Sequence, residues 1–293
     1  MIYTDWSELV ALNKTGKPIA LGGYPRGGTT FAYRCLGALV RQPWHLEEYF
    51  HIFYEFKKNK FGEVVIDTDT IEDKKQQGVA INPPKDETWY KELNRRYHMV
   101  RDQHSWDKVY IKVLPYHARD LKITSENYYY DLVRNNWWIH VLREDYINMI
   151  LSNLYSNNFN RFHYYGDQPL PDKPFTTWIN EVDLIYKQQF LLLYQQWQDS
   201  NGCGVFVPAE SITHLKEPIS DRPVVSQEIS NLIRAGRQRT RAPRLDKNKP
   251  DLFRKIIINY DETVDRIRSM VQQVERETDG FFTFTDTQVK VNA

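Results

Sequence analysis

The chain has 293 residues, with 39 lysines and arginines against 38 aspartates and glutamates, so its formal net charge is +1. This balance argues against a surface built throughout to hold nucleic acid, and 41% hydrophobic with 26% charged residues excludes wholesale disorder. Two cysteines are too few for a disulfide framework or a four-thiolate zinc site. No apolar run approaches the roughly 18–20 residues that span a bilayer. We therefore expect a cytoplasmic protein with no membrane span, folded as one domain over residues 1–293.

The first predicted elements are a strand, a glycine turn and a helix. Residues 18–23, Pro-Ile-Ala-Leu-Gly-Gly, form a short apolar run that ends on glycines, which indicates a buried strand. Residues 31–40 carry apolar side chains at helical spacing. Residues 57–86 are charged and contain Asn-Pro-Pro, so we expect an exposed insertion there.

Two further buried strands are predicted at residues 109–114 and 137–142, both apolar runs of strand length. The second is followed by a periodic helix for which Asp145 is a suitable N-cap. A loop is expected over residues 157–174 and a long helix over 176–198.

A fourth strand is predicted at residues 204–208, and the last third of the chain is expected to be helical, at about 225–235 and 250–277. Strands that alternate with helices predict an α/β fold, with a parallel sheet flanked by helices on both faces. Ligands of such sheets bind at the carboxyl ends of the strands, so the chemistry is expected there.

The turn after the first strand has the composition of an anion-binding loop. Residues 22–30 read Gly-Gly-Tyr-Pro-Arg-Gly-Gly-Thr-Thr and lead into the helix. Glycines allow backbone N–H groups to face a phosphate, and the helix N-terminus adds about half a positive charge. The loop therefore predicts phosphate binding, although a plain glycine turn with a surface arginine is the simpler alternative.

This loop differs from the nucleoside triphosphate pattern G-x-x-x-x-G-K-[ST] in the place of its cation. Gly22, Gly27 and Thr29 keep their positions, but Gly28 stands where the lysine would be. The cation is Arg26, which precedes the second glycine pair. This arrangement suits one terminal phosphate that carries a single transferable group.

Residues 24–30 resemble the 5′-phosphosulfate loop of P-loop sulfotransferases that use 3′-phosphoadenosine 5′-phosphosulfate (PAPS). That family usually shows Pro-[Arg/Lys]-Ser-Gly-[Thr/Ser]-Thr, so Gly27 replaces the common serine and its hydroxyl is absent. The resemblance implies a P-loop nucleotide-binding fold, with PAPS as the cofactor and Arg26 as a catalytic cation. It also implies a set of cofactor-binding loop residues: Arg26, Gly27, Gly28, Thr29 and Thr30.

A second motif of the family is a strand that ends in arginine, followed by a helical serine, and these two residues bind the 3′-phosphate. Residues 139–155 are similar to it, with Arg143 and Ser152 at the matching places. Their spacing of nine is one longer than in many members, and bacterial trehalose-type sulfotransferases resemble this longer form. An arginine at a strand end can offer a bidentate fork to a phosphate, and a helical hydroxyl adds a donor.

Transfer of a sulfuryl group to an alcohol requires a base for the hydroxyl proton. Residues 42–50 offer His45, Glu47 and Glu48 as candidates. Trehalose-type members have a glutamate before an aromatic pair in this region, and Glu48 with the Tyr-Phe that follows resembles it. The resemblance implies Glu48 as the base, whereas a solvated or capping glutamate on the next helix is the alternative.

Lys112 is the second catalytic candidate, because a lysine inside an apolar strand is costly unless its ammonium finds an anion. A strand end open to water is the simpler reading. Residues 110–115 resemble the Lys-Thr-His-Leu-Pro element of cytosolic members, one residue shorter, and His117 beyond the proline is a further candidate base. A basic run at residues 234–244 can be a solvated loop, a patch for an anionic acceptor or a cover for the 3′-phosphate.

The resulting hypothesis is a PAPS-dependent sulfotransferase that acts by in-line displacement, without a metal, on a hydroxyl or amine. The acceptor is a small molecule or a glycan, and the trehalose-type resemblance favours a carbohydrate or glycolipid. One alternative is a divergent P-loop kinase or nucleotide hydrolase, which the missing lysine at Gly28 disfavours. Another is a non-catalytic module that binds an anion or nucleotide; no nucleic acid partner is expected.

Overall fold

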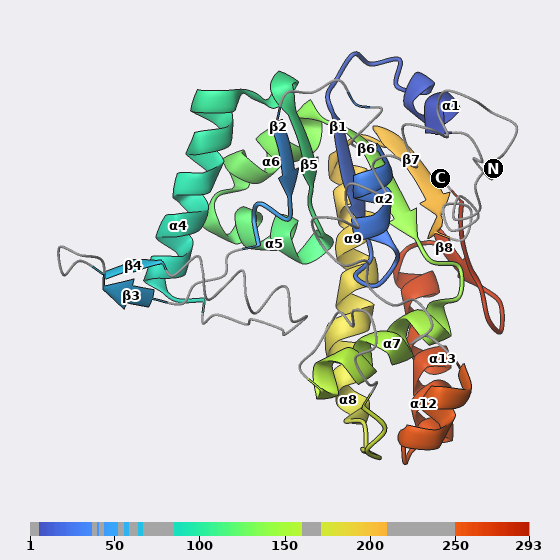
Figure 1. The fold of residues 1–293 in the computed structure, drawn as a ribbon. Helices are drawn as coiled ribbons and strands as arrows, with labels where there is room; N and C mark the ends of the chain where they lie inside the picture. The colour runs from blue at the N-terminus through green and yellow to red at the C-terminus, as the bar shows by residue number, and fades with distance from the viewer. Residues whose placement is uncertain are drawn as a thin grey trace, which may run out of the picture.

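The computed structural model describes residues 6–36, 40, 44–51, 56–58, 64–66, 85–159, 171–209 and 250–292. Their centre is a five-stranded sheet in the order β2-β5-β1-β6-β7, in which every neighbouring pair is parallel (Figure 1). The strands are β1 (Ile19–Gly23), β2 (Trp44–Glu47), β5 (Val109–Lys112), β6 (Trp137–Leu142) and β7 (Gly204–Pro208). The predicted α/β class with a parallel sheet is confirmed.

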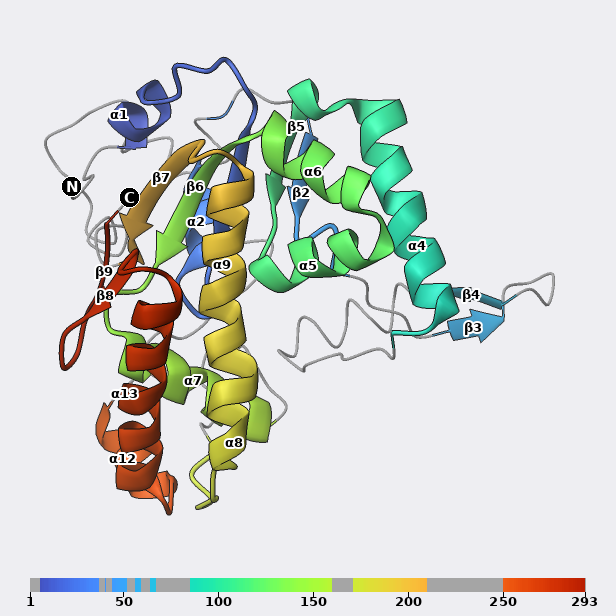
Figure 2. The same ribbon diagram turned by 180° about the vertical axis from the view of Figure 1, so that it is seen from behind.

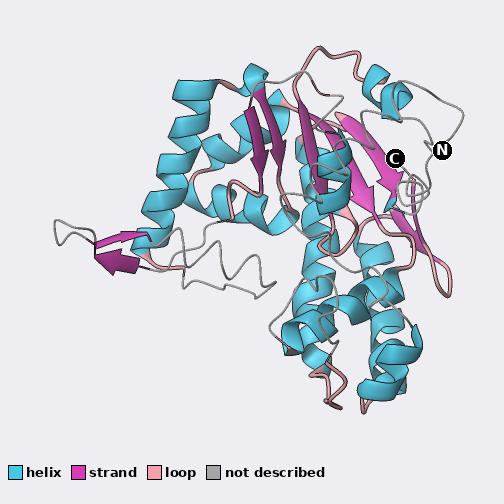
Figure 3. Ribbon diagram, viewed as in Figure 1, coloured by secondary structure: helices cyan, strands magenta, loops and turns pink. Residues whose placement is uncertain are grey.

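Helices surround this sheet, and two small hairpins lie outside it (Figure 3). The α-helices are α1 (Trp6–Ala11), α2 (Thr29–Leu36), α4 (Glu87–His98), α5 (Pro115–Thr124), α6 (Glu126–Asn135), α7 (Tyr146–Asn158), α8 (Ile179–Glu181), α9 (Gln188–Asp199), α12 (Pro250–Ile256) and α13 (Tyr260–Glu277). Short π- or 3₁₀-helical segments are η1 (Met99–His104), η2 (Trp106–Lys108) and η3 (Val182–Lys187). The hairpins are β3 (Phe56–Lys58) with β4 (Val64–Ile66), and β8 (Phe282–Phe284) with β9 (Val289–Val291).

Alternation along β1 sends side chains to both faces of the sheet. Ile19 and Leu21 pack with α1 and α2 on one face, whereas Ala20 belongs to a cluster with α4, α5 and α6 on the other. Figure 2 shows α5, α6 and α9 over the face opposite α2. Helices therefore flank the sheet on both faces, as the sequence predicts.

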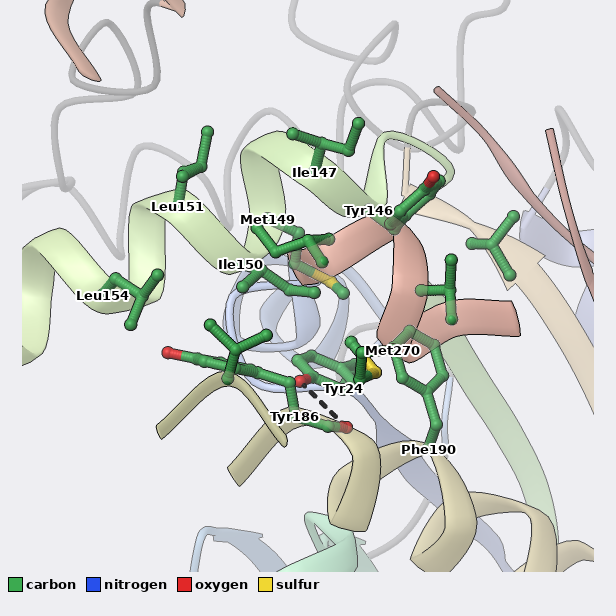
Figure 4. Close-up of a cluster of buried hydrophobic side chains, with 14 of the residues drawn as sticks. Tyr24, Tyr146, Ile147, Met149, Ile150, Leu151, Leu154, Tyr186, Phe190 and Met270 are labelled. Atoms are coloured by element: carbon green, nitrogen blue, oxygen red, sulfur yellow. Dashed lines mark hydrogen bonds between the residues drawn. The ribbon is translucent and has the colours of Figure 1, made fainter. Parts of the chain in front are cut away.

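A third apolar cluster lies beyond the carboxyl ends of the strands, where α7, η3, α9, α12 and α13 meet (Figure 1). Tyr24, the residue that follows β1, is fully buried in it. Its ring centroid is 4.8 Å from that of Phe190, and its hydroxyl donates to the carbonyl of Tyr186 at 3.5 Å. Figure 4 shows Met270 of α13 in the same cluster. Late elements of the chain thus fix the start of the glycine loop.

The four predicted strands are present, whereas β2 and the terminal hairpin were not predicted. The helix predicted at 31–40 begins earlier, at Thr29, and the one at 176–198 begins at Ile179 with the π-helical η3 inside it. The Asp145 N-cap is confirmed, since its carboxylate accepts the Asn148 N–H at 3.0 Å.

The helix predicted at 250–277 is broken into α12 and α13. Phe175 and Ile257 form an isolated bridge, and the Asn259 side chain accepts the Thr177 N–H at 2.9 Å. These contacts hold residues 257–259 against another segment in place of a continuous helix. The helix predicted near 225–235 and most of the 57–86 insertion lie outside the described residues. In the part of the chain that is described, no helix is long and apolar enough to cross a membrane.

Candidate functional site at the carboxyl ends of the strands

The glycine loop joins β1 to α2 by a tight turn. The Gly27 N–H donates to the Tyr24 carbonyl at 2.9 Å, and the Ala32 N–H donates to the Gly28 carbonyl at 3.0 Å. The first backbone N–H groups of a helix have no partner within the helix, so those at the start of α2 are suited to an anion. The loop lies at the carboxyl end of the central strand, as predicted.

Local crowding explains the glycine at 27. A Cβ added to Gly27 would lie 2.8 Å from the Tyr24 carbonyl oxygen and 3.3 Å from that of Val141. The serine usual in the sulfotransferase loop would therefore force the backbone to shift. Arg26 has φ of 66° and Gly28 has φ of 82°, both in the left-handed region. This region is unfavourable for a residue with a side chain, and such strain is concentrated at functional sites.

Arg26 connects the two predicted motifs. Its guanidinium Nη2 donates to the Ser152 Oγ at 3.5 Å, and Ser152 is buried on α7. Arg143 directly follows β6, and its backbone nitrogen lies 3.6 Å from the place a Gly27 Cβ would take. The Arg143 Nη2 is 3.9 Å from Asp145 Oδ2. Residues predicted to bind the two ends of one cofactor thus lie together.

Lys112, at the end of β5, links the loop to the candidate base. Its side chain is fully buried, and its Nζ donates to Thr30 Oγ1 at 2.7 Å and to Glu48 Oε1 at 2.6 Å. A buried ammonium requires an anion, and the carboxylate of Glu48 supplies it. Lys112 is therefore not at a strand end open to water, and its catalytic role stays a prediction.

Glu48 belongs to a turn, not to the helix that the sequence analysis considered. The register of β2 against β5 pairs Glu47 with Lys112, so the residue after β2 lies at the same sheet end. Glu48 has φ of 52°, and the His51 N–H closes the turn on its carbonyl at 2.8 Å. The His51 Nδ1 lies 3.5 Å from Glu48 Oε2.

Two residues of the first turn of α5 complete this group. The His51 ring centroid is 4.9 Å from that of His117 and 5.9 Å from that of Tyr116. The Leu114 N–H donates to the His117 Nδ1 at 3.3 Å, which leaves the ring proton of a neutral His117 on Nε2. Glu48, His51, Tyr116 and His117 therefore form a compact polar cluster beside Lys112.

The electrostatics of the cluster follow from burial and from Lys112. Burial raises the pKa of Glu48, but the Lys112 ammonium and His51 together hold it well below its usual range. Burial, reinforced by His51, lowers the pKa of His117 well below that of a free imidazole. Burial and Glu48 raise the pKa of Tyr116. At neutral pH the cluster therefore holds an ionised carboxylate beside a neutral imidazole and a neutral phenol.

The structure leaves some predicted candidates undecided. The side chains of His45 and Glu47 and the basic run 234–244 lie outside the described residues. Sequence reasoning did not find His51, although its spacing of three from Glu48 is a local signal. No group of three or more potential metal ligands occurs among the residues described.

Comparison with known proteins yields no relative: no protein-family model, curated protein or solved structure matches this chain.

Proposed function

We propose that the protein is a PAPS-dependent sulfotransferase with a P-loop nucleotide-binding fold. The observation that carries this proposal is the meeting of two motifs from distant parts of the chain at one sheet end. Arg26 of the glycine loop contacts Ser152 of the second motif, 126 residues later, at 3.5 Å. Each motif alone is weak, but their juxtaposition is the geometry that a nucleotide with phosphates at both its 5′ and 3′ positions requires.

The residues present fit such a cofactor. Gly28 is exposed, and the start of α2 supplies N–H groups for a 5′ anion, with Thr29 and Thr30 beside them. Arg143 and Ser152, across the loop at the end of β6 and on α7, supply donors for a 3′-phosphate. Bound PAPS would supply an activated sulfuryl group.

The remaining residues account for the charge and the proton in an in-line transfer. Arg26 and Lys112 supply positive charge near the leaving phosphate oxygen, on which negative charge develops during the transfer. Glu48, joined to the loop through Lys112 and Thr30, is the carboxylate base that receives the acceptor proton in this proposal. The acceptor is a hydroxyl or amine compound, and the trehalose-type resemblance favours a carbohydrate or glycolipid.

One observation favours a second candidate, a divergent kinase or nucleotide hydrolase. The loop has no lysine at Gly28, but Lys112 of a neighbouring strand brings an ammonium to it and contacts Thr30 Oγ1 at 2.7 Å. A lysine in this place can also contact a β- or γ-phosphate. The partly exposed carboxylate of Glu48 neutralises it, which weighs against a triphosphate site.

Thermal unfolding with ligands separates the two candidates. For a sulfotransferase we expect 3′-phosphoadenosine 5′-phosphate (PAP) to raise the melting temperature by several degrees, with little effect of ATP and magnesium. Adenosine 5′-monophosphate is the control, because it lacks the 3′-phosphate. Strong stabilisation by ATP and magnesium without an effect of PAP would reject the sulfotransferase.

A further inference from the structure

The terminal hairpin of β8 and β9 is separate from the five-stranded sheet, yet it contacts the chain directly after Arg143. The Val289 N–H donates to the Glu144 carbonyl at 2.9 Å, and Gln288 forms an isolated antiparallel bridge with Asp145. Residues 144 and 145 therefore lie along β9 as a short third segment. The backbone that follows Arg143 is thus held by the last element of the chain.

The first residue of α7 adds side-chain contacts to the same hairpin. Tyr146 is buried, and its hydroxyl donates to the Thr285 carbonyl at 3.2 Å, with the Asp286 carbonyl at 3.4 Å. Its ring packs edge-on against that of Phe284, with centroids 5.3 Å apart. The segment that joins Arg143 to α7 therefore contacts the hairpin through its backbone and through its first aromatic ring.

Strand β8 also reaches the glycine loop, through one intermediate ring. The ring centroid of Phe190 lies 5.4 Å from that of Phe282 and 5.5 Å from that of Phe284. Phe190 also contacts Tyr24, at 4.8 Å between centroids, and Tyr24 is two residues before Arg26. The hairpin thus contacts the second motif directly and the glycine loop through Phe190.

We propose that this hairpin is a positioning element for the cofactor, which holds Arg143 in place and so determines the affinity for the 3′-phosphate. The inference rests on the proposed function and deepens it by adding an element to the 3′-phosphate site. Asp145 connects the two parts, because its backbone forms the bridge with Gln288 and its carboxylate lies 3.9 Å from Arg143 Nη2. A shift of the backbone at 145 therefore moves a carboxylate that faces the guanidinium.

The coupling between the hairpin and the cofactor must act in both directions. A two-stranded hairpin is marginally stable by itself, so its order depends on the surfaces on which it packs. A docked hairpin that favours the binding-competent position of Arg143 is itself stabilised, by the same free energy, when the 3′-phosphate binds. Bound PAP should therefore slow the exchange of amide hydrogens in the hairpin.

The direction of the N–H groups along β9 provides a variant and a matched control. The Val289 N–H points away from β8, as its bond to Glu144 shows, and alternation gives Val291 the same direction. Val289→Pro removes the donor to Glu144 without removing a bond between β8 and β9. Val291→Pro is the same substitution on the same strand, at a place where, among the described residues, no hydrogen bond to 143–146 is lost.

Calorimetry with PAP and with adenosine 5′-phosphosulfate, which lacks the 3′-phosphate, measures the effect. We expect Val289→Pro to weaken PAP binding by about five- to fiftyfold, no more than Arg143→Ala, and adenosine 5′-phosphosulfate binding by less than about twofold. Val291→Pro should bind both nucleotides as the wild type does. In the Arg143→Ala background, Val289→Pro should cost nothing further, because it acts through that arginine. Equal losses for both nucleotides, or additive losses in the double variant, would overturn the inference.

Tyr146→Phe is a milder variant that keeps the ring in place and removes only the hydroxyl bond to the hairpin. It should weaken PAP binding by about two- to tenfold, the range of one net hydrogen bond, and leave adenosine 5′-phosphosulfate binding unchanged. If Val289→Pro does not fold, unchanged PAP binding by Tyr146→Phe contradicts the positioning role.

Hydrogen exchange of the full-length protein, read by mass spectrometry, separates this inference from the proposed function. PAP should slow exchange over residues 282–291 of the wild type, and Val289→Pro without ligand should exchange faster than the wild type over 143–148. If the wild type binds no PAP, the sulfotransferase proposal fails and the positioning role fails with it. If it binds PAP while the hairpin exchanges at an unchanged rate and Val289→Pro keeps its affinity, the sulfotransferase proposal stands and this inference alone is wrong.

Discussion

The ion pair between Lys112 and Glu48 predicts an unequal response to removal of its two members. Their Nζ–Oε1 distance of 2.6 Å corresponds to an attraction of about 6 kcal/mol at an effective dielectric constant of about 20. Desolvation offsets much of this attraction. The Lys112 side chain is fully buried, whereas 28% of the Glu48 side chain is exposed. A lone Glu48 can therefore hydrate, and a lone Lys112 cannot.

We expect Glu48→Ala to lower the free energy of unfolding by about 3–5 kcal/mol, because it leaves a buried ammonium without its carboxylate. Lys112→Met fills the same space and leaves a carboxylate that reaches water, so its cost should be about 1–2 kcal/mol. The double variant should be no less stable than Glu48→Ala alone. Urea unfolding at pH 7, followed by circular dichroism, measures all three. Equal costs for the single variants, or additive costs in the double variant, would refute this account of the pair.

Two further predictions concern Arg143 and His140. Arg143→Ala should weaken PAP binding by about ten- to a hundredfold and adenosine 5′-phosphosulfate binding much less, because a charge-assisted contact is worth about 1.5–3 kcal/mol and only PAP has a 3′-phosphate; equal losses in calorimetry would place Arg143 elsewhere. Burial lowers the pKa of His140 to about 3, so the unfolded chain binds its proton first on acidification and stability falls from about pH 6.5 downward. Between pH 7.5 and pH 5 this group should remove about 2 kcal/mol of stability in the wild type and none in His140→Leu, and an identical loss in both proteins in urea unfolding would contradict the shift.

The sequence predicts the glycine loop well, because its signals are local. An apolar run that ends on glycines determines β1, and the hydroxyl-rich start of α2 follows directly. In contrast, β2 was not predicted. Among the described residues it is an edge strand of four residues that pairs with β5 alone, and its Trp-His-Leu-Glu sequence lacks the continuous apolar pattern of a central strand.

The candidate base site is less predictable, because its contacts depend on where β2 lies in the sheet. The sequence predicts that Lys112 needs an anion, but the identity of the anion depends on the register of β2 beside β5. The position of His51 beside Glu48 depends on the left-handed turn at Glu48 and on α5, whose residues are distant in the sequence. Such relations arise from tertiary packing and leave no periodic pattern in the chain.

The burial of Tyr24 among late elements has a consequence for the order in which this protein matures. The side chain that begins the glycine loop packs on Phe190 and lies in one cluster with Met270 of α13 (Figure 4). During synthesis, the last residue of β1, Gly23, is added 247 residues before Met270. The strands can begin to pair in that interval, but the apolar cluster that holds Tyr24 is completed only after α13 has been made. A chain that stops before α13 therefore carries the loop sequence without the apolar contacts that hold Tyr24.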